Sequence, residues 1–438
     1  MIKAGFARID VTPPLGTPLA GYFSSRISEG VLDPLQLNAV AFGSGEVSAL
    51  LIVCDLIGVT MERADVYRAH VAAATGVDAD HILLTSLHQH TSIYIGGRIG
   101  DAEDYALVED VAYLDVLQRK FCDVARMAIA DMSDARLFTS EAEATPQLSF
   151  TRRYVMEDGS IRTNPAPKYG TPVRRCDASD NAVRVVRFER TDKKDIVIAN
   201  FSTHPDVIGG KKISADWPGF TRRFVEGDQN VHCICMVGCQ GDSNHVDFIK
   251  PKEERLVGGA GLSHSAFMGR TIADTVAKCC TAETEHTGDT VFGGVKLIYN
   301  RTSTAGEEHY DEAKQFMEIY ERGEKPNLPN VRDVAYAMRT VRQRTASMNR
   351  AVPVSVLAIG DVAFVGFGGE PFTHYGTATR EGAPDKTVLC ACCANGYEGY
   401  LLTDSAFAEG GYEAATSLFT TGLESQCVGA ALEMLSKI

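Results

Sequence analysis

The 438-residue sequence has no long apolar run, no excess of basic residues and no secretion-type leader, and each absence excludes a class of protein. Because no stretch of about 18 consecutive apolar residues occurs, we expect no transmembrane helix. The 43 Lys and Arg residues are outnumbered by 57 Asp and Glu, which gives a net charge of −14. Such a chain repels polyanions, so neither nucleic acid nor an anionic membrane surface is expected as a partner. Residues 1–8 lack the apolar core of a signal peptide, and we therefore expect a cytoplasmic protein.

The twelve cysteines do not indicate the framework of a secreted, disulfide-rich protein. Several lie in apolar, strand-like runs, such as Cys54 in LLIVCDL and the pair Cys233 and Cys235 in VHCICMVG. Without a secretion signal, this placement favours buried, reduced thiols. Cys390 and Cys393 form a C-x-x-C pair, but no second pair accompanies them. A zinc–thiolate site is therefore not expected there.

Hydrophobic periodicity predicts an α/β protein. Strands are predicted at residues 37–42, 48–55, 81–86, 182–189, 195–202, 232–237, 290–299, 354–359, 362–367 and 387–394. Helices are predicted at about residues 62–75, 113–132, 259–280, 307–322 and 418–436. The Arg-rich segment 330–349 is also typical of a helix, and we expect it to be a solvated excursion. No long Gly/Ser-rich or Pro-rich linker divides the chain, so residues 1–438 are expected to form one catalytic domain.

A His-x-His pair follows a buried strand in the run LLTSLHQHTS. Loops that leave strand ends often carry metal ligands and catalytic groups, because the rigid sheet fixes their direction. In a strand, residues i and i+2 share a face, so His88 and His90 are expected to point into one cavity. One histidine would bind a metal ion while the other contacts substrate. Two hydrogen-bonded structural histidines are the alternative interpretation.

Two further strand-like runs end in residues that also bind metals. The run IVIANFSTHP delivers His204 to a strand end, where Pro205 stops the strand from continuing. The run VAFVGFGGEPF places Glu370 after two flexible glycines. Two histidines and one glutamate are a familiar ligand set of catalytic zinc. The three strand ends together therefore predict a zinc hydrolase with one catalytic Zn²⁺ ion.

Four segments follow one another in an order that carries a resemblance. They are GFARIDVTPPLGTPLAGY with the later Asp33-Pro34, TSLHQHTS, GFGGEPF, and NGYEGYLLT followed by EGGYE. Taken in this order, they resemble the start, the S-x-x-His-Thr-His-Ser-Gly-Pro motif, the Gly-Glu-Phe segment and the paired-tyrosine motif of neutral/alkaline ceramidases. The resemblance spans essentially the whole chain. It implies the fold of that family's amidase domain, with layered mixed β-sheets flanked by helices and without the C-terminal β-sandwich domain.

The resemblance also implies a set of site residues. The zinc ligands it implies are His88, His204, Glu370 and Tyr400. The residues it places around the substrate carbonyl and the tetrahedral oxyanion are His90, Arg152 and Tyr412. Strong, fixed donors stabilise such an oxyanion best in a dry pocket.

The sequence departs from the family at two places. Where ceramidases carry Gly-Asp-Val-Ser-Pro-Asn, this chain has CQGDSNH, so the serine is shifted by one to Ser243 and Asn244 takes its place. The shift argues against a serine-assisted step, although Asn244 can still donate a hydrogen bond. The chain ends at Ile438, with no room for the further domain. Together with the missing signal peptide, this size favours a small soluble substrate over membrane ceramide.

The sequence therefore predicts a zinc-dependent hydrolase that cleaves an amide (N-acyl) bond of a small molecule by means of a metal-activated water. A zinc esterase or lactonase is the nearest alternative, because it needs the same electrophile and differs only in its leaving group. A non-catalytic binding protein of the same fold is the alternative from another class. We expect Asp206 or Asp216 to orient a ligand histidine. The sequence does not distinguish a monomer from a homo-oligomer.

Overall fold

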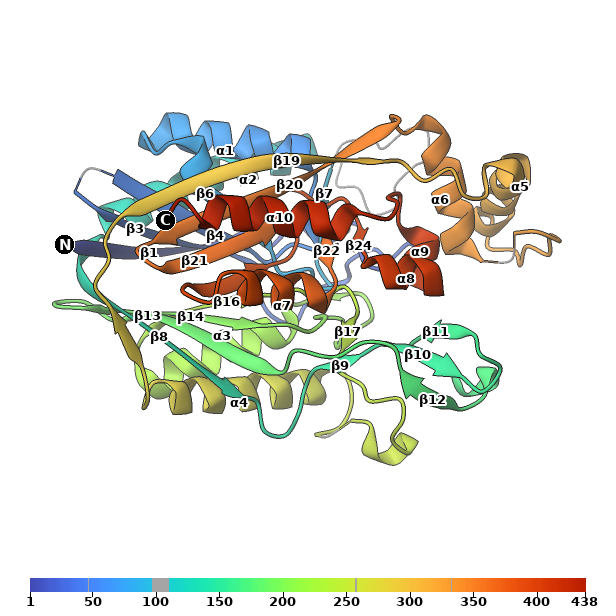
Figure 1. Ribbon diagram of the computed structural model, residues 1–438, viewed down its shortest axis with the longest axis horizontal. Helices are drawn as coiled ribbons and strands as arrows, with labels where there is room; N and C mark the ends of the chain where they lie inside the picture. The colour runs from blue at the N-terminus through green and yellow to red at the C-terminus, as the bar shows by residue number, and fades with distance from the viewer. Residues whose placement is uncertain (46, 97–109, 257, 332) are drawn as a thin grey trace.

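The computed structural model describes residues 1–45, 47–96, 110–256, 258–331 and 333–438, which are organised around two β-sheets (Figure 1). The larger sheet is formed by β1 (Ile2–Asp10), β3 (Gln36–Ser44), β4 (Val47–Cys54), β6 (Ile82–Ser86), β8 (Ser133–Glu143), β13 (Ala182–Arg190), β14 (Ile196–Phe201), β16 (His232–Val237) and β18 (Thr284–His286). Its strand order is β16-β14-β13-β8-β1-β3-β4-β6, and β18 pairs with β8. The pairs β4–β6 and β14–β16 are parallel. Because β16 also contacts β4, the sheet curls and brings its two ends toward each other.

The smaller sheet consists of β19 (Val291–Arg301), β20 (Asn349–Ile359), β21 (Val362–Phe367) and β23 (Thr387–Ala391), in that order. Alternate residues of β21 face opposite sides, as the strand period requires. Phe364 belongs to the core that the two sheets share, where its ring lies 6.0 Å from that of Phe42 in β3. Phe367 belongs instead to the core on the other face of the smaller sheet. The two sheets are therefore packed layers with a common apolar interior.

Helices cover the outer faces of these sheets. They are α1 (Met61–Thr75), α2 (Val111–Ala130), α3 (Asp216–Gln229), α4 (Leu262–Cys279), α7 (Thr373–Gly382) and α10 (Leu423–Leu435). Helix α2 packs on β1 and β3, and α1 packs beside it. Helices α3 and α4 pack on β8, β13 and β16, and α7 and α10 cover the smaller sheet. This arrangement confirms the predicted α/β fold of layered mixed sheets flanked by helices (Figure 1).

The remaining elements gather at the end of the molecule opposite the two chain termini (Figure 1). Four short helices lie there: α5 (Tyr310–Glu321), α6 (Val334–Thr345), α8 (Asp404–Glu409) and α9 (Tyr412–Thr416). A small sheet is made by β10 (Arg153–Met156), β11 (Ile161–Thr163) and β12 (Pro172–Arg175). Two short strand pairs hold site residues, namely β22 (Glu370–Pro371) with β24 (Tyr400–Leu401), and β9 (Phe150–Thr151) with β17 (Ser243–Asn244).

The expectations for thiols and membrane helices are also tested by the structure. None of the twelve cysteines forms a disulfide, and nine of them are buried. Within the described ranges, no helix has both the length and the apolar character needed to cross a membrane.

Candidate metal centre

His88 lies two residues beyond the end of β6, in a turn that changes the direction of the chain. Its φ of 68° is left-handed, so the strand alternation that we used to place His88 and His90 on one face does not apply there. The turn buries the imidazole and brings its Nδ1 to 2.8 Å from the carbonyl oxygen of Ile57. With the Nδ1 proton donated to that carbonyl, Nε2 is left as the ligand atom. It lies 3.2 Å from Oε2 of Glu370.

His204 follows β14 and is held in the same manner. Its Nδ1 lies 2.9 Å from the carbonyl oxygen of Gln240 and 3.1 Å from that of Ser243. Its Nε2 lies 3.2 Å from the same Oε2 of Glu370. Both histidines are therefore oriented by backbone carbonyls, and the prediction that a carboxylate would orient them is wrong.

The two aspartates of that prediction have other partners. Oδ1 of Asp206 lies 3.2 Å from Nδ1 of His245. The carboxylate of Asp216 accepts hydrogen bonds from the backbone N–H of Ile208 and from the hydroxyl of Ser265. Asp216 thus secures the start of α3 rather than a metal ligand.

Glu370 reaches the site from the short strand β22, which pairs in parallel with β24 so that Glu370 lies opposite Tyr400. The hydroxyl of Tyr397 donates a 3.0 Å hydrogen bond to Oε1, while the buried Oε2 accepts none. Burial disfavours the ionised carboxylate, but the electrostatic influence of His88 and His204 outweighs it and holds the pKa of Glu370 well below its usual value. The carboxylate is therefore negative and turned toward two imidazole nitrogens.

His90 adds a third imidazole to this cluster. Its ring centre lies 5.2 Å from that of His88 and 5.7 Å from that of His204, and ligand atoms of all three lie within 4.8 Å of one another. Both ring nitrogens of His90 are buried without a hydrogen-bond partner. Burial lowers the pKa of His90 to about 3, so its ring is neutral at neutral pH. Gly21, with φ of 99°, makes room for this ring, because a Cβ there would lie 2.6 Å from its Cγ.

The donor set fits a zinc ion. Zinc binds imidazole nitrogen and carboxylate oxygen at about 2.0–2.1 Å, so two donors of a tetrahedral site lie about 3.3 Å apart. The observed separations of Oε2 from the two Nε2 atoms are both 3.2 Å. Buried polar atoms without hydrogen bonds, such as Oε2 of Glu370, normally have a partner in the working molecule. These residues are therefore suited to hold a divalent metal.

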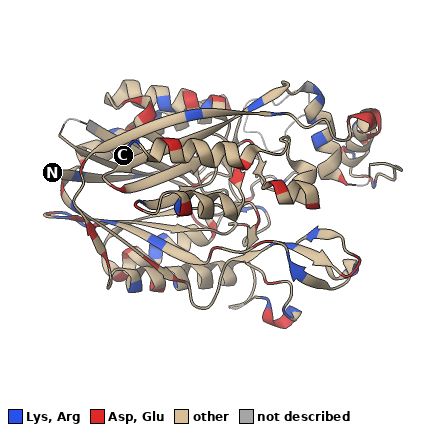
Figure 2. Ribbon diagram, in the orientation of Figure 1, with Lys and Arg blue, Asp and Glu red and all other residues tan. Residues whose placement is uncertain are grey.

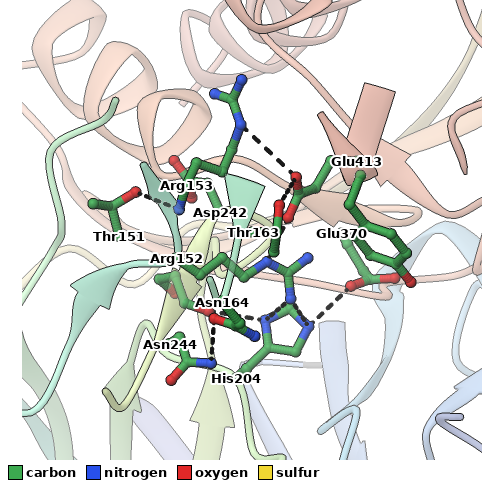
Figure 3. Close-up of polar contacts among 12 residues, drawn as sticks. Thr151, Arg152, Arg153, Thr163, Asn164, His204, Asp242, Asn244, Glu370 and Glu413 are labelled. Carbon is green, nitrogen blue, oxygen red and sulfur yellow. Dashed lines mark hydrogen bonds and ion pairs between the residues drawn. The ribbon is translucent and has the colours of Figure 1, made fainter. Parts of the chain in front are cut away.

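The guanidinium of Arg152 lies next to the ring of His204 and is balanced by a buried carboxylate (Figure 3). Its Nε donates a 2.7 Å hydrogen bond to Oε1 of Glu413, and its Nη1 lies 3.0 Å from Nε2 of His204. Thr163 donates to the other oxygen of Glu413. Since Arg152 is 4% exposed and Glu413 is fully buried, each charge depends on the other.

The paired tyrosines lie next to each other at the cavity. The ring centres of Tyr400 and Tyr412 are 5.7 Å apart, and the guanidinium of Arg152 lies 5.0 Å from the ring centre of Tyr400. Burial raises the pKa of both phenols, well above the usual value for Tyr400. Without a metal, both hydroxyls therefore stay protonated and act as hydrogen-bond donors.

The segment in which this chain departs from the ceramidase motif is buried beside the site. Nδ2 of Asn244 donates to Oδ1 of Asn164 at 3.0 Å, and Oδ1 of Asn244 accepts from the backbone N–H of Val246 (Figure 3). The hydroxyl of Ser243 donates to the carbonyl oxygen of Gln240 at 3.2 Å. Neither side chain lines the cavity. Their hydrogen bonds shape the loop whose carbonyls hold His204.

A cavity of about 230 Å³ opens beside the three histidines. Its lining includes five of the predicted site residues, namely His88, His90, Glu370, Tyr400 and Tyr412. Helix α6 contributes Ala335, Met338, Arg339 and Arg342 to the same lining. The prediction of a solvated excursion at 330–349 is therefore wrong, because this helix is a wall of the cavity.

Two residues of the site, one partly buried and one fully buried, were missed at the level of the sequence. Tyr397, which binds Glu370, and Glu413, which binds Arg152, both lie inside the segments that carry the ceramidase resemblance. A buried arginine requires a carboxylate partner, but the sequence does not show which of many carboxylates it meets. The available signal for Glu413 was its position directly after Tyr412 in the run EGGYE.

The fold is that of a neutral ceramidase-like α/β protein. The structure of neutral ceramidase from Pseudomonas aeruginosa matches with a TM-score of 0.69 at 15% identity, over 99% of this chain and 74% of that chain. A structure described as a ceramidase complexed with C2 matches with a TM-score of 0.71 at 14% identity, over the same shares of the two chains. No protein-family model and no curated protein matches the sequence. At these identities, the likeness establishes the fold.

Proposed function

We propose that the chain is a zinc-dependent hydrolase that cleaves an amide (N-acyl) bond of a small soluble molecule. The observation that carries this proposal is the position of Oε2 of Glu370, 3.2 Å from Nε2 of both His88 and His204. All three side chains are buried, and two of them line a cavity that admits a small molecule. The ceramidase-like fold supports an amide as the bond that is cleaved.

In this proposal, zinc is held by His88, His204, Glu370 and Tyr400. A zinc ion supplies a Lewis acid that polarises a carbonyl and lowers the pKa of a water toward about 7. Backbone carbonyls fix the Nδ1 proton of both histidines, so their Nε2 atoms are left without a proton and can act as metal ligands. The hydroxyl of Tyr397 holds the second oxygen of Glu370 and so fixes the direction of the first.

The residues around the proposed ligands bind the substrate and hold the site in shape. His90 is neutral and its ring nitrogens have no hydrogen-bond partner among the described residues, so its ring N–H can orient the substrate carbonyl. The hydroxyl of Tyr412 donates a hydrogen bond to the carbonyl oxygen as negative charge develops there. Arg152 adds a fixed positive charge beside His204, and Asn244 keeps Asn164 and the adjoining loop in place.

The size of the cavity favours a small substrate. Its volume is about 230 Å³. Ligand pockets for drug-sized molecules begin at about 300 Å³. A short acyl group and a small amine therefore match the enclosed space better than a lipid with two long chains.

Replacing His204 with alanine tests the proposal. We expect His204→Ala to lose both bound zinc and hydrolysis, because the substitution removes a ligand at the end of β14. The matched control is His70→Ala, which removes an exposed histidine from α1. Zinc is measured by elemental analysis, and turnover is measured on N-acyl and O-acyl compounds that share one acyl group.

Each alternative gives a different result. Full activity in a metal-free His204→Ala protein would refute the zinc mechanism. Hydrolysis of the O-acyl compounds alone would indicate an esterase or lactonase. Purified wild-type protein without stoichiometric metal and without turnover would indicate a binding protein of the same fold.

A further inference from the structure

The wall of the cavity contains three arginines. Helix α6 contributes Arg339 and Arg342, and the following strand β20 contributes Arg350. Figure 2 shows that acidic and basic residues are otherwise interspersed over the ribbon. Arg350 is neutralised, because its guanidinium lies 2.5 Å from the carboxylate of Glu398 in the same wall. The chain as a whole carries a net charge of −14. A basic wall inside an acidic protein is therefore a local feature of the cavity and not a consequence of composition.

Arg339 is the arginine whose surroundings are most unusual. It is only 6% exposed, and its Nε is buried without a hydrogen-bond partner. Its Nη2 donates to the carbonyl oxygen of Ala305 at 2.9 Å, and the guanidinium lies 5.0 Å from the ring centre of Tyr336. Among the residues that the structure describes, no carboxylate lies within ion-pair distance of Arg339. Glu308 acts on it only through space, and its own carboxylate is exposed.

A buried guanidinium without a carboxylate is costly, because the charge has lost water and gained no countercharge. A neutral partner such as a backbone carbonyl satisfies one N–H group and leaves the charge uncompensated. Arg152, on the opposite side of the site, shows how the same protein balances a buried arginine, with Glu413 at 2.7 Å. No described residue supplies the corresponding countercharge for Arg339, and a carboxylate of a molecule in the cavity would supply it.

We propose that Arg339 binds a carboxylate of the substrate, so that the amide cleaved at the metal centre belongs to an acidic molecule such as an N-acylated amino acid. The inference rests on the proposed hydrolase function and adds the chemical class of its substrate. The planar guanidinium matches a carboxylate with two parallel hydrogen bonds, which fixes orientation as well as charge. Anchored at α6, the substrate would present its amide group to His90 and Tyr412, which line the same cavity.

The test uses pairs of compounds that differ only in this charge. N-benzoyl and N-acetyl amino acids are each compared with their own carboxamides, on the metal-loaded wild-type protein. The quantity compared is kcat/KM where a compound is hydrolysed and the dissociation constant from calorimetry where it is not. A carboxylate that binds the metal itself would be preferred in every variant, so the variants separate that effect from Arg339.

Three substitutions complete the design. Arg339→Gln removes the charge, and Arg339→Lys keeps the charge but loses the planar pair of donors. Arg344→Gln is the matched control, because it removes the same charge from an exposed position of α6, where the guanidinium lies 4.2 Å from the ring centre of Tyr310. The zinc content of each variant reports whether the metal centre is still assembled.

We expect wild type and Arg344→Gln to prefer at least one carboxylate over its carboxamide by about tenfold to a hundredfold. Arg339→Gln should abolish that preference, and Arg339→Lys should restore part of it. The inference is overturned if the wild-type protein prefers none of the carboxylates over its carboxamide. It is also overturned if the preference for a carboxylate survives in a zinc-loaded Arg339→Gln protein. Absence of zinc together with absence of hydrolysis of every acidic and neutral amide would instead refute the proposed function.

Discussion

His88 shows how a single backbone conformation sets the direction of a ligand. A non-glycine residue at φ 68° costs of order 1–3 kcal/mol, and such strain persists where the surroundings hold the residue in place. Here the backbone N–H of His88 donates to the carbonyl of Leu56, and its Nδ1 faces the carbonyl of Ile57. The turn converts the outgoing direction of β6 into one that meets His204 and Glu370. The strained backbone conformation of His88 is therefore what directs its imidazole toward His204 and Glu370.

Tyr397 offers the sharpest test at the residue scale, since one hydroxyl connects it to Glu370. We expect Tyr397→Phe to weaken zinc binding by about tenfold to a hundredfold, the usual effect of losing a group that orients a metal ligand. The phenyl ring keeps its packing against Gly58 and Tyr94. Zinc affinity is measured by competition with a chromophoric chelator.

The control for this substitution is Tyr375→Phe. Tyr375 is fully buried in α7, and its hydroxyl donates to the carbonyl oxygen of Leu402 away from the cavity. Its loss should leave zinc affinity unchanged. Equal weakening by both substitutions would show that the effect of Tyr397 is general destabilisation.

At the scale of elements, the short pair of β22 and β24 places a carboxylate and a phenol side by side. Its position depends on the close approach of another loop, because a Cβ on Gly241 would collide with the carbonyl oxygen of Glu370. The backbone N–H of Gly241 also donates to the carbonyl of Pro371 at 2.8 Å. The loop that orients His204 and the strand that carries Glu370 are thereby fixed to each other.

We expect Gly241→Ala to lower zinc occupancy and to reduce the free energy of unfolding by about 1–3 kcal/mol, because the added methyl group must displace β22. Urea denaturation and elemental analysis measure the two quantities. Gly429→Ala in α10 is the control, since a Cβ there meets nothing within 4 Å. The control should leave stability unchanged or raise it by about 0.5–1 kcal/mol. Normal zinc occupancy in Gly241→Ala would contradict the role given to this contact.

Elements with strong apolar patterns were predictable from sequence. The predicted strands at 232–237 and 362–367 coincide with β16 and β21. Helix α3 was not predicted because Pro218 and Gly219 resemble breakers, although Pro218 lies in the first turn, where it needs no hydrogen-bond partner. Strand β8 was not predicted because exposed residues at its start and end interrupt the apolar pattern.

The site was predictable in part because apolar strands lead to three of its residues. His88, His204 and Glu370 follow apolar strands, so their approach to one another could be inferred from strand ends. The left-handed turn at His88 and the burial of α6 could not, because both depend on contacts between segments distant in sequence. The set of four zinc ligands, the catalytic roles and the single domain stay predictions.

At the scale of the whole molecule, the metal centre connects the two sheets. His88 and His204 follow strands of the larger sheet, while Glu370 follows a strand of the smaller one. A bound ion would therefore cross-link two layers. Because an ion that binds only the folded chain stabilises it by mass action, free zinc at a hundred times its dissociation constant adds about 2.7 kcal/mol.

We accordingly expect removal of zinc by a chelator to lower the melting temperature, and re-addition of zinc to restore it. Thermal denaturation followed by circular dichroism measures the shift. His204→Ala should melt at one temperature with or without zinc, since it lacks a ligand. A melting temperature of the wild-type protein that ignores both chelator and zinc would contradict a metal held between the sheets.

The distribution of the ligands along the chain has a consequence for biosynthesis. His88 and His204 leave the ribosome long before Glu370 and Tyr400, which lie in the last fifth of the sequence. A nascent chain therefore presents two imidazoles without the carboxylate that faces both of them in the finished protein. Such a half-built site holds a metal ion weakly and exchanges it readily. Firm retention of an ion would thus require that Glu370 and Tyr400 have been synthesised and that both sheets have packed.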